Sequence, residues 1–269
     1  MQPLPSDIAR FIKRTGYVPN LVNPRTHSEH VMYKKYHDRD PLLTLTADKI
    51  AVRKWIRDQG EEQIVVALHN CGYQVPVRVT AIPCVIKMNN ASARNAFVFT
   101  PADARDVLPR IAKWLTMPYG QKKGEWCYQN ITPGFIEEPL IWQKDESHII
   151  YRWLCFHGAP RYIEAHEYAS KRAGQKSKPK NLSHAVYRVP WDLQEVTIDG
   201  RPTIKRDPPR SYWNMRRIAT KLSAPFDFVR VDLFEYAGKV WFSEMTHYPR
   251  SGQYHYDPRS FDYELGALW

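Results

Sequence analysis

Apolar residues recur along this chain at two spacings, one typical of helices and one typical of strands. The helical spacing predicts helices over residues 46–62, 101–116 and 211–223. In the first of them Ile50 and Trp55 lie on one side, and Gly60 provides a stop. An aromatic and basic stretch, residues 30–40, is a further helix candidate, and the rest of the first 45 or so residues is predicted to be irregular.

Shorter runs rich in β-branched and aromatic residues predict strands over 63–68, 84–90, 95–100, 133–141 and 148–165. Two more runs, within residues 228–252, flank Ala237-Gly238 and predict a β-hairpin. Helices and strands mix without the regular alternation of parallel α/β proteins. The predicted fold class is therefore α+β.

The predicted hairpin carries four polar residues within its apolar runs: Arg230, Asp232, Glu244 and Thr246. Their arrangement depends on the turn, because side chains alternate between the two faces of a strand. A two-residue loop places Asp232 opposite Ser243 and sends the two acids to opposite faces. The hairpin would then be an edge ribbon with solvated charges.

A three-residue loop, with Gly238 forming a bulge, pairs position 232 with 244 and position 230 with 246. All four polar residues then share one face, which the pair Phe234 and Phe242 continues. Two carboxylates opposite each other repel unless a cation lies between them, and such oxygen ligands suit Mg²⁺. The register of the hairpin decides between these two interpretations.

Composition and charge narrow the class of protein. The chain of 269 residues is 43% hydrophobic, which is typical of a globular protein, and its formal net charge is +11. Lys and Arg are spread along the chain rather than gathered in a stripe, which argues against a nucleic-acid partner. The one local concentration, residues 170–181, is predicted to be a solvated flexible loop, and contact with an anionic substrate stays open as the alternative.

The sequence contains neither a signal-peptide pattern at its start nor a membrane-spanning apolar run. Its four cysteines are scattered without a Cys-x-x-Cys motif, as in proteins of a reducing compartment. We therefore expect a cytoplasmic protein. The histidines show no metal-ligand spacing with cysteine, which argues against a structural zinc site.

Six segments in order resemble the ATP-grasp superfamily, and more narrowly its TupA-like branch, named for teichuronopeptide biosynthesis. They are "NPRTHSEHVMYKKYHDRDPLLTLTADKIAVR", "CVIKMNNAS", "GEWCYQNITPGFIEEPLI", "YRWLCFHGAP", "FVRVDLFEYAGKVWFSEMTHYP" and "DYELGAL". The resemblance implies an α+β fold whose two subdomains clasp ATP, with an N-terminal segment (1–45) packed on a catalytic domain (46–269). It also implies a basic insertion at 166–208.

The activity that this resemblance implies is an ATP-dependent carboxylate–amine ligase. ATP phosphorylates a carboxylate and an amine attacks the acyl phosphate, so the implied cofactors are ATP and Mg²⁺ and the implied partners are an anionic acceptor and an amine donor. Relatives in the branch point to an acidic surface polysaccharide, sugar or peptide as acceptor. Two alternatives stay open: a kinase on the same scaffold, and a degenerate, non-catalytic binding module.

The hairpin residues acquire roles through the resemblance. Asp232 and Glu244 match the metal carboxylates, and Thr246 stands where the superfamily commonly has Asn. Arg230 matches the arginine that would stabilise the acyl phosphate or the oxyanion. Arg152 stands where the branch has a lysine, and a basic residue there fits a phosphate or a substrate carboxylate.

Nucleotide contacts follow in the same way. Lys49, expected on a helix face, and Lys87, at the end of a strand, match the two lysines that grip the phosphates of ATP. The phosphate loop of the branch is rich in glycine, whereas here residues 90–95 read "NASARN" and offer the Ser92 hydroxyl as a donor. This departure bears on how the γ-phosphate is covered and on turnover.

The adenine linker is expected near residues 136–145. Glu138 resembles the acid at its start, and because Pro139 has no N–H, Leu140 or Ile141 must donate to the base. Asp145 is placed like the acid that holds the ribose hydroxyls. About 45 residues precede Lys49, too few for a separate Rossmann-like domain.

Overall fold

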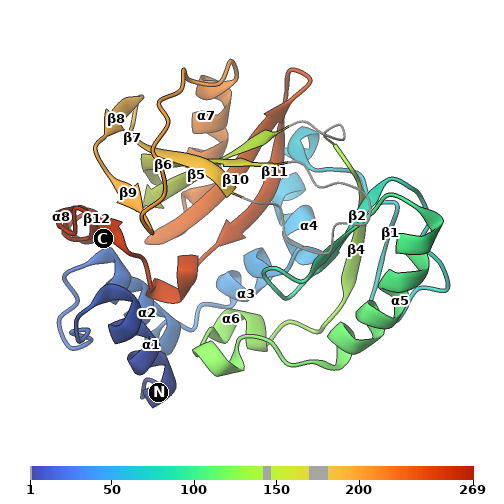
Figure 1. The fold of residues 1–269 in the computed structure, drawn as a ribbon, viewed down its shortest axis with the longest axis horizontal. Coiled ribbons are helices and arrows are strands. Elements are labelled where there is room, and N and C mark those ends of the chain that lie inside the picture. The colour runs from blue at the N-terminus through green and yellow to red at the C-terminus, as the bar shows by residue number, and fades with distance from the viewer. Residues whose placement is uncertain (1, 142–146, 170–180) are drawn as a thin grey trace.

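The computed structural model of the protein describes residues 2–141, 147–169 and 181–269. Two antiparallel sheets dominate it, a four-stranded sheet and a six-stranded one, with helices between and around them (Figure 1). The α+β class is confirmed. Within the described residues no helix has the length and apolar character needed to cross a membrane.

The smaller sheet has the strand order β1-β4-β2-β3, formed by Asn70–Gly72, Phe135–Pro139, Cys84–Met88 and Asn95–Val98. Helix α5, Pro101–Thr116, covers one face through Val107 and Ile111 (Figure 1). Its predicted bounds are confirmed, because Thr100 forms a capping box with Asp103 and proline occupies the first turn. The other face of this sheet carries Lys87 and Glu138.

The larger sheet has the order β11-β10-β5-β6-β7-β8. In chain order its strands are β5 His148–Phe156, β6 Ala159–Tyr168, β7 Asn181–Arg188, β8 Asp192–Gln194, β10 Phe228–Tyr236 and β11 Lys239–Thr246. The predicted helix at 211–223 is α7, Tyr212–Ser223, and it packs on one face, where the Tyr212 and Trp153 rings lie 5.5 Å apart. The described part of the predicted basic insertion, 166–208, thus supplies strands to this sheet.

The connection between the two sheets differs from the prediction. Instead of one helix over 46–62, α3 (Pro41–Ala47) ends before Asp48 and α4 (Ala51–Asp58) begins three residues later. The Asp48 carboxylate accepts from the Ile50 N–H at 2.8 Å, a side-chain bond that competes with helix continuation. Lys49 therefore lies in a turn between two helices, not on a helix face.

The strand predicted over 63–68 was also wrong. Residues Glu62–Ile64 form a short 3₁₀ helix, η1, and no strand follows until β1. Ile64 and Val66 are buried in the core without a ladder partner. A short apolar run cannot be assigned by its pattern alone, and here burial accounts for the apolar residues without a sheet.

The N-terminal segment is helical rather than irregular. Helix α1, Pro5–Thr15, was not predicted, and α2, His27–His37, corresponds to the candidate at 30–40. Both lie beside the C-terminal elements η3 (Pro249–Gly252), β12 (Tyr256–Asp257) and α8 (Ser260–Gly266), while β12 pairs with β9 (Thr197–Ile198) (Figure 1). The fully buried Lys35 Nζ bonds Asp7 at 2.5 Å and the Ser251 hydroxyl at 2.9 Å. The hydrogen bonds from Lys35 to Ser251 tie the start of the chain to the segment that follows β11.

The hairpin of β10 and β11 resolves the question of register. Arg230 pairs with Thr246 and Asp232 with Glu244, so the predicted pairs are confirmed. The predicted cause was wrong: Tyr236 pairs with Lys239, so the loop has two residues, and the register shift lies between Asp232 and Leu233. The extra residue is Ser243, not Gly238. Beyond this bulge Phe234 faces Trp241, not Phe242 as expected.

The tight turn gives a first testable prediction. Ala237 and Gly238 both have positive φ, 52° and 74°, the geometry of a type I′ turn. A left-handed alanine is strained, whereas asparagine tolerates this conformation, so Ala237→Asn should stabilise the fold by about 1 kcal/mol. The exposed Ala267, with φ −71°, is the matched control. The thermal unfolding midpoints of Ala237→Asn and of the control Ala267→Asn test this prediction. An equal change in both variants would contradict it.

A second prediction concerns a buried histidine. His27 is fully buried against Phe228, and among the described residues neither of its ring nitrogens has a partner. Burial lowers its pKa to about 3. The folded protein therefore keeps His27 neutral where the unfolded chain, with a pKa of about 6.5, takes up a proton. Because the unfolded chain takes up this proton and the folded protein does not, the free energy of unfolding falls as pH falls from about 6.5 toward 3. The loss is about 1.4 kcal/mol per pH unit.

Substitution isolates this contribution. As pH is lowered from about 6 to 4, the free energy of unfolding of His27→Phe should rise relative to that of wild type, by about 1.4 kcal/mol for each pH unit. Denaturant unfolding at several pH values measures it. His255→Phe is the control, since the exposed His255 ring loses little hydration on folding. A relative stability of His27→Phe that does not change with pH would contradict the prediction.

Candidate functional site: a charged cleft between the two sheets

A narrow cleft separates the smaller sheet from strand β11, with the α3–α4 turn on its third side. Its walls bring together segments that lie far apart in the sequence. The lining residues are Thr46, Ala47, Lys49, Val52, Arg53, Lys87, Tyr128, Ile136, Glu138, Phe242, Ser243, Glu244 and Met245. Five of these side chains are formally charged at pH 7, three of them basic and two acidic, which suits a ligand that carries its own charges.

A row of charged side chains continues from the cleft across the larger sheet. Glu244 on β11 pairs with Asp232 on β10, Asp232 with Arg152 on β5, and Arg152 with Glu164 on β6. Neighbouring partners in antiparallel strands point to the same face, so the four side chains form one line. The Arg152 Nε lies 3.6 Å from Asp232 Oδ2.

Arg230 holds the hairpin residues together. Its Nε and Nη2 donate to the two oxygens of Asp232 at 2.7 Å each, and Nη2 also reaches Glu244 Oε1 at 3.1 Å and the Thr246 hydroxyl at 3.2 Å. Arg230 is 5% exposed and Asp232 2%. The two opposed carboxylates repel each other, and the guanidinium between them supplies the positive charge that offsets this repulsion.

The two acids differ in their environment. Burial raises the pKa of Asp232 to about 6, although the guanidinium groups of Arg230 and Arg152 act in the opposite direction. Burial also acts to raise the pKa of Glu244, but Lys49, Arg230 and Arg152 together bring it below its ordinary value. Glu244 is the more accessible, with 31% of its side chain exposed.

The two predicted lysines lie on adjacent walls of the cleft, Lys49 on the α3–α4 turn and Lys87 on the smaller sheet. Lys87 on β2 forms an ion pair with Glu138 of β4, with Nζ 2.5 Å from Oε2. Lys49 donates to the Ala91 carbonyl at 3.0 Å, and burial lowers its pKa. Arg53 of α4, which sequence reasoning missed, binds the other oxygen of Glu138 at 3.1 Å. Glu138 is thus held between two cations at the cleft wall.

The loop after β2 contains the predicted Ser92 and is joined to the cleft residue Lys49 through the Ala91 carbonyl. Ser92 is exposed, and its hydroxyl accepts from the Tyr119 hydroxyl at 2.9 Å. Ala93 has a φ of 62°, a conformation that glycine adopts without strain. The loop therefore keeps a left-handed turn although it has no glycine. Asn90 is buried, and its Oδ1 has no partner among the described residues.

The predicted adenine linker is only partly visible. Glu138 closes β4 together with Pro139, and Leu140 follows it, half-buried. Asp145 lies outside the described residues. The structure therefore places Lys49, Lys87, Glu138 and Glu244 around one cleft, with Arg230, Asp232, Thr246 and Arg152 on the adjoining sheet face.

Glu164 is the second residue that sequence reasoning missed. It is fully buried and lies within hydrogen-bonding distance of His166, at 3.2 Å, and the Tyr256 hydroxyl, at 3.2 Å. Burial opposes its charge, yet the bond from His166 and the nearby Arg152 keep its pKa at about 2. The period-2 pattern of β6 could have placed Glu164 beside Arg152 only if the strand register had been known.

The hairpin donors fit a hard cation. Asp232, Glu244 and Thr246 present only oxygen atoms, and Glu244 bonds Arg230 through Oε1. Two carboxylates plus phosphate and water oxygens are a usual environment for Mg²⁺. Among the described residues no group of three or more His, Cys, Asp or Glu could hold a metal by itself. A cation here would thus depend on oxygens from a ligand.

Comparison with known proteins adds a family and a set of similar folds. The TupA-like ATP-grasp family matches residues 29–269. The chain is similar to a D-alanine–D-alanine ligase from Bacillus anthracis (14% identity, TM-score 0.46, 84% of this chain and 67% of that one). It is also similar to an L-amino acid ligase from Bacillus licheniformis (12% identity, TM-score 0.44, 76% and 44%). No curated protein matches it.

Proposed function

Because this chain belongs to the TupA-like ATP-grasp family, we propose that it is an ATP-dependent carboxylate–amine ligase. The observation that carries the proposal is the arrangement of Asp232, Glu244 and Arg230 on one sheet face, beside a cleft that holds Lys49 and Lys87. The acceptor is an acidic sugar, polysaccharide or peptide, whose carboxylate is activated as an acyl phosphate. The net charge of +11 supports an anionic partner.

Each group has a role in this reaction. Lys49 and Lys87 bind the phosphates from adjacent walls of the cleft, and Glu138 orients Lys87 through their ion pair. Mg²⁺, held by Asp232, Glu244 and the Thr246 hydroxyl, would neutralise charge on the phosphates. Arg230 and Arg152 donate hydrogen bonds to the acyl phosphate and to its acyl oxygen, which becomes an oxyanion when the amine attacks and before phosphate leaves.

The buried row behind the cleft supports this division of roles. Arg152 lies between Asp232 and Glu164 in the sheet and donates to the Tyr168 hydroxyl at 2.6 Å. Its Nε has no hydrogen-bond partner among the described residues, although it is buried. A buried donor without a partner is costly, and a substrate carboxylate or phosphate oxygen would satisfy it.

Trapping with hydroxylamine tests the proposal. A ligase that activates a carboxylate gives a hydroxamate when hydroxylamine replaces the amine, whereas a kinase releases ADP without one. We expect Mg²⁺-dependent ADP release and a hydroxamate with at least one member of a panel of uronic acids, glutamate and glutamyl peptides. ADP release without any hydroxamate would favour the kinase. Absence of Mg-ATP binding by calorimetry at millimolar nucleotide would favour a non-catalytic binding module.

A further inference from the structure

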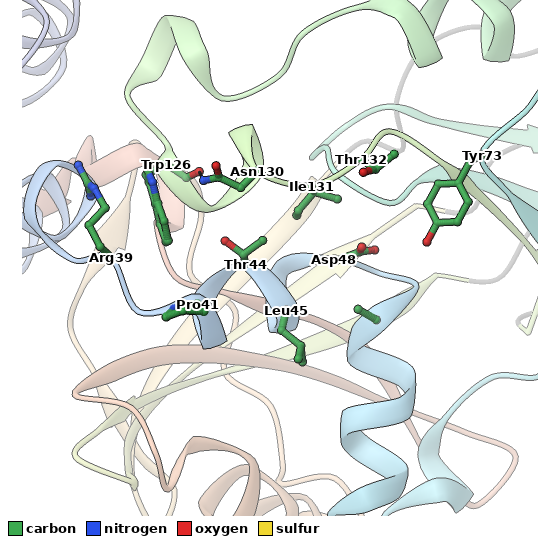
Figure 2. Close-up of a pocket in the computed structure, with 11 residues that line it drawn as sticks. Arg39, Pro41, Thr44, Leu45, Asp48, Tyr73, Trp126, Asn130, Ile131 and Thr132 are labelled. Carbon is green, nitrogen blue, oxygen red and sulfur yellow. Dashed lines mark hydrogen bonds between the residues drawn. The ribbon is translucent and has the colours of Figure 1, made fainter.

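A second cavity among the described residues lies outside the cleft. It measures about 680 Å³, within the usual range of small-molecule sites, and opens between α3 and the loop after α6, Trp126–Gln129. Figure 2 shows Trp126 at one end and Tyr73 at the other, with Thr44, Asn130 and Asp48 between them. We call this cavity the aromatic groove.

Trp126 is held in place before any ligand arrives. The Arg39 guanidinium lies 5.2 Å from the Trp126 ring centre. Three backbone carbonyls fix Arg39 in turn, those of Lys35 at 3.2 Å, Tyr36 at 2.7 Å and Asp38 at 2.5 Å. A ring fixed in this way loses little entropy when a ligand stacks on it. At the other end Tyr73 is 55% exposed, so its ring is accessible.

Between the two rings the groove offers oxygen acceptors. Thr44 Oγ1 is buried and has no hydrogen-bond partner among the described residues. Asp48 uses Oδ1 for the Ile50 N–H and the Asn89 amide, and Asn130 uses its amide nitrogen for the Trp126 carbonyl. Within the described residues these bonds leave Asp48 Oδ2 and Asn130 Oδ1 to a ligand, and both accept hydrogen bonds.

These features select a class of ligand. Aromatic rings at both ends suit the C–H faces of sugar rings, and oxygen acceptors between them suit sugar hydroxyls as donors. Arg39 is already engaged by carbonyls and Asp48 is negative, so nothing in the groove favours an anion. An acidic peptide would bring its carboxylates toward Asp48, where like charges repel.

The groove and the cleft meet at adjacent residues. Asp48 lines the groove and Lys49 lines the cleft, on two sides of the same turn. The fully buried Asn89 joins them: its amide donates to Asp48 and to the Thr132 carbonyl, and its backbone carbonyl accepts from the Lys49 N–H. A ligand in the groove therefore contacts the residues that position Lys49 and the start of the phosphate loop.

We propose that the aromatic groove is a saccharide subsite that binds a neutral sugar unit of the acceptor. The inference rests on the proposed function, since it assigns the acceptor of that ligase to the glycans. The neutral unit stacks between Trp126 and Tyr73, and an acidic unit of the same molecule supplies the carboxylate that is activated in the cleft.

Calorimetric titration of the whole protein tests this, with maltotriose, cellotriose and N,N′-diacetylchitobiose as neutral probes and hexaglutamate as the peptide probe. We expect at least one sugar to bind with a Kd of about 1 mM, and hexaglutamate not to displace it. Tyr73→Ala should weaken sugar binding about tenfold through loss of the ring, and Thr44→Val about fivefold through loss of the acceptor. Trp213→Ala, which removes an exposed aromatic ring on α7, is the matched control and should bind as wild type does.

Three results would overturn the proposal: no sugar binding at about 20 mM, sugar binding that Tyr73→Ala and Thr44→Val leave unchanged, or binding of hexaglutamate that Tyr73→Ala abolishes. The last would assign the groove to a peptide. Hydroxamate formation by the wild-type protein is measured separately. Sugar binding without hydroxamate would therefore count against the proposed ligase and not against the groove.

Discussion

Asp232→Asn is expected to lower Mg²⁺-dependent ATP turnover by about three orders of magnitude, the scale of losing a charged group at a reacting centre. The substitution keeps the shape of the side chain and an acceptor for Arg230, but it removes the charge that a metal ion requires. Burial raises the pKa of Asp232 to about 6, so the fold itself does not favour the charge. We therefore expect the free energy of unfolding to change by less than about 2 kcal/mol.

Activity and stability have to be measured together for this variant. Coupled-enzyme detection of ADP gives turnover, and denaturant unfolding gives stability. Glu235→Gln is the matched control, because Glu235 lies on the same strand three positions away, with its carboxylate bound to the Ser211 N–H. Turnover of Asp232→Asn within tenfold of wild type would exclude a metal role for this carboxylate. A comparable loss in Glu235→Gln would indicate damage to the hairpin instead.

Arg230→Gln is expected to destabilise the fold by about 3–5 kcal/mol, because it leaves two carboxylates opposite each other without their cation. Asp232 would lose both of its short bonds to the guanidinium, and Glu244 and Thr246 would lose the donor they share. Mg²⁺ can replace the missing positive charge. Addition of Mg²⁺ with ATP, whose phosphate oxygens supply the remaining ligands, should therefore raise the melting temperature of Arg230→Gln more than that of wild type.

The control for this variant is an arginine whose ion pair is exposed. Arg188 binds Glu264 at the surface with about half of its side chain exposed, and surface pairs contribute about 1 kcal/mol or less. Arg188→Gln should therefore change stability little and show no added response to Mg²⁺ with ATP. If the two variants unfold at the same denaturant concentration, Arg230 does not hold the carboxylates together.

Local signals in the sequence predicted some elements closely. Helix α5 was predicted with its bounds because a capping box and a proline mark its first turn. Helix α1 was missed although Leu4, Ile8 and Phe11 follow a helical spacing and line one apolar cluster. Its pattern was present but short. The break at Asp48 had a weaker signal, since an aspartate within an apolar period is compatible with either a helix or a turn.

The candidate site shows where sequence reasoning ends. The members of the hairpin cluster were predicted, and their pairing was predicted too, but through a three-residue loop that does not exist. Nothing about Ser243 marks it as an extra residue, because bulges depend on the partner strand. Glu164 and Arg53 were missed for a related reason. Each meets its partner only through contacts between distant elements, which no local pattern encodes.

The bulge at Ser243 has a consequence for how this hairpin can vary among related proteins. The register of Asp232 is fixed from its other side by Arg152, and the bulge lies between that rung and the turn. The outer ribbon, residues 235–240, lies beyond the Phe234–Ile150 rung with β5 and can therefore gain or lose cross-strand pairs without moving the charged rungs. We expect length variation to be tolerated there and excluded between positions 243 and 246. A ribbon of changeable length projecting from a fixed site is a place where substrate preference can diversify while the chemistry stays the same.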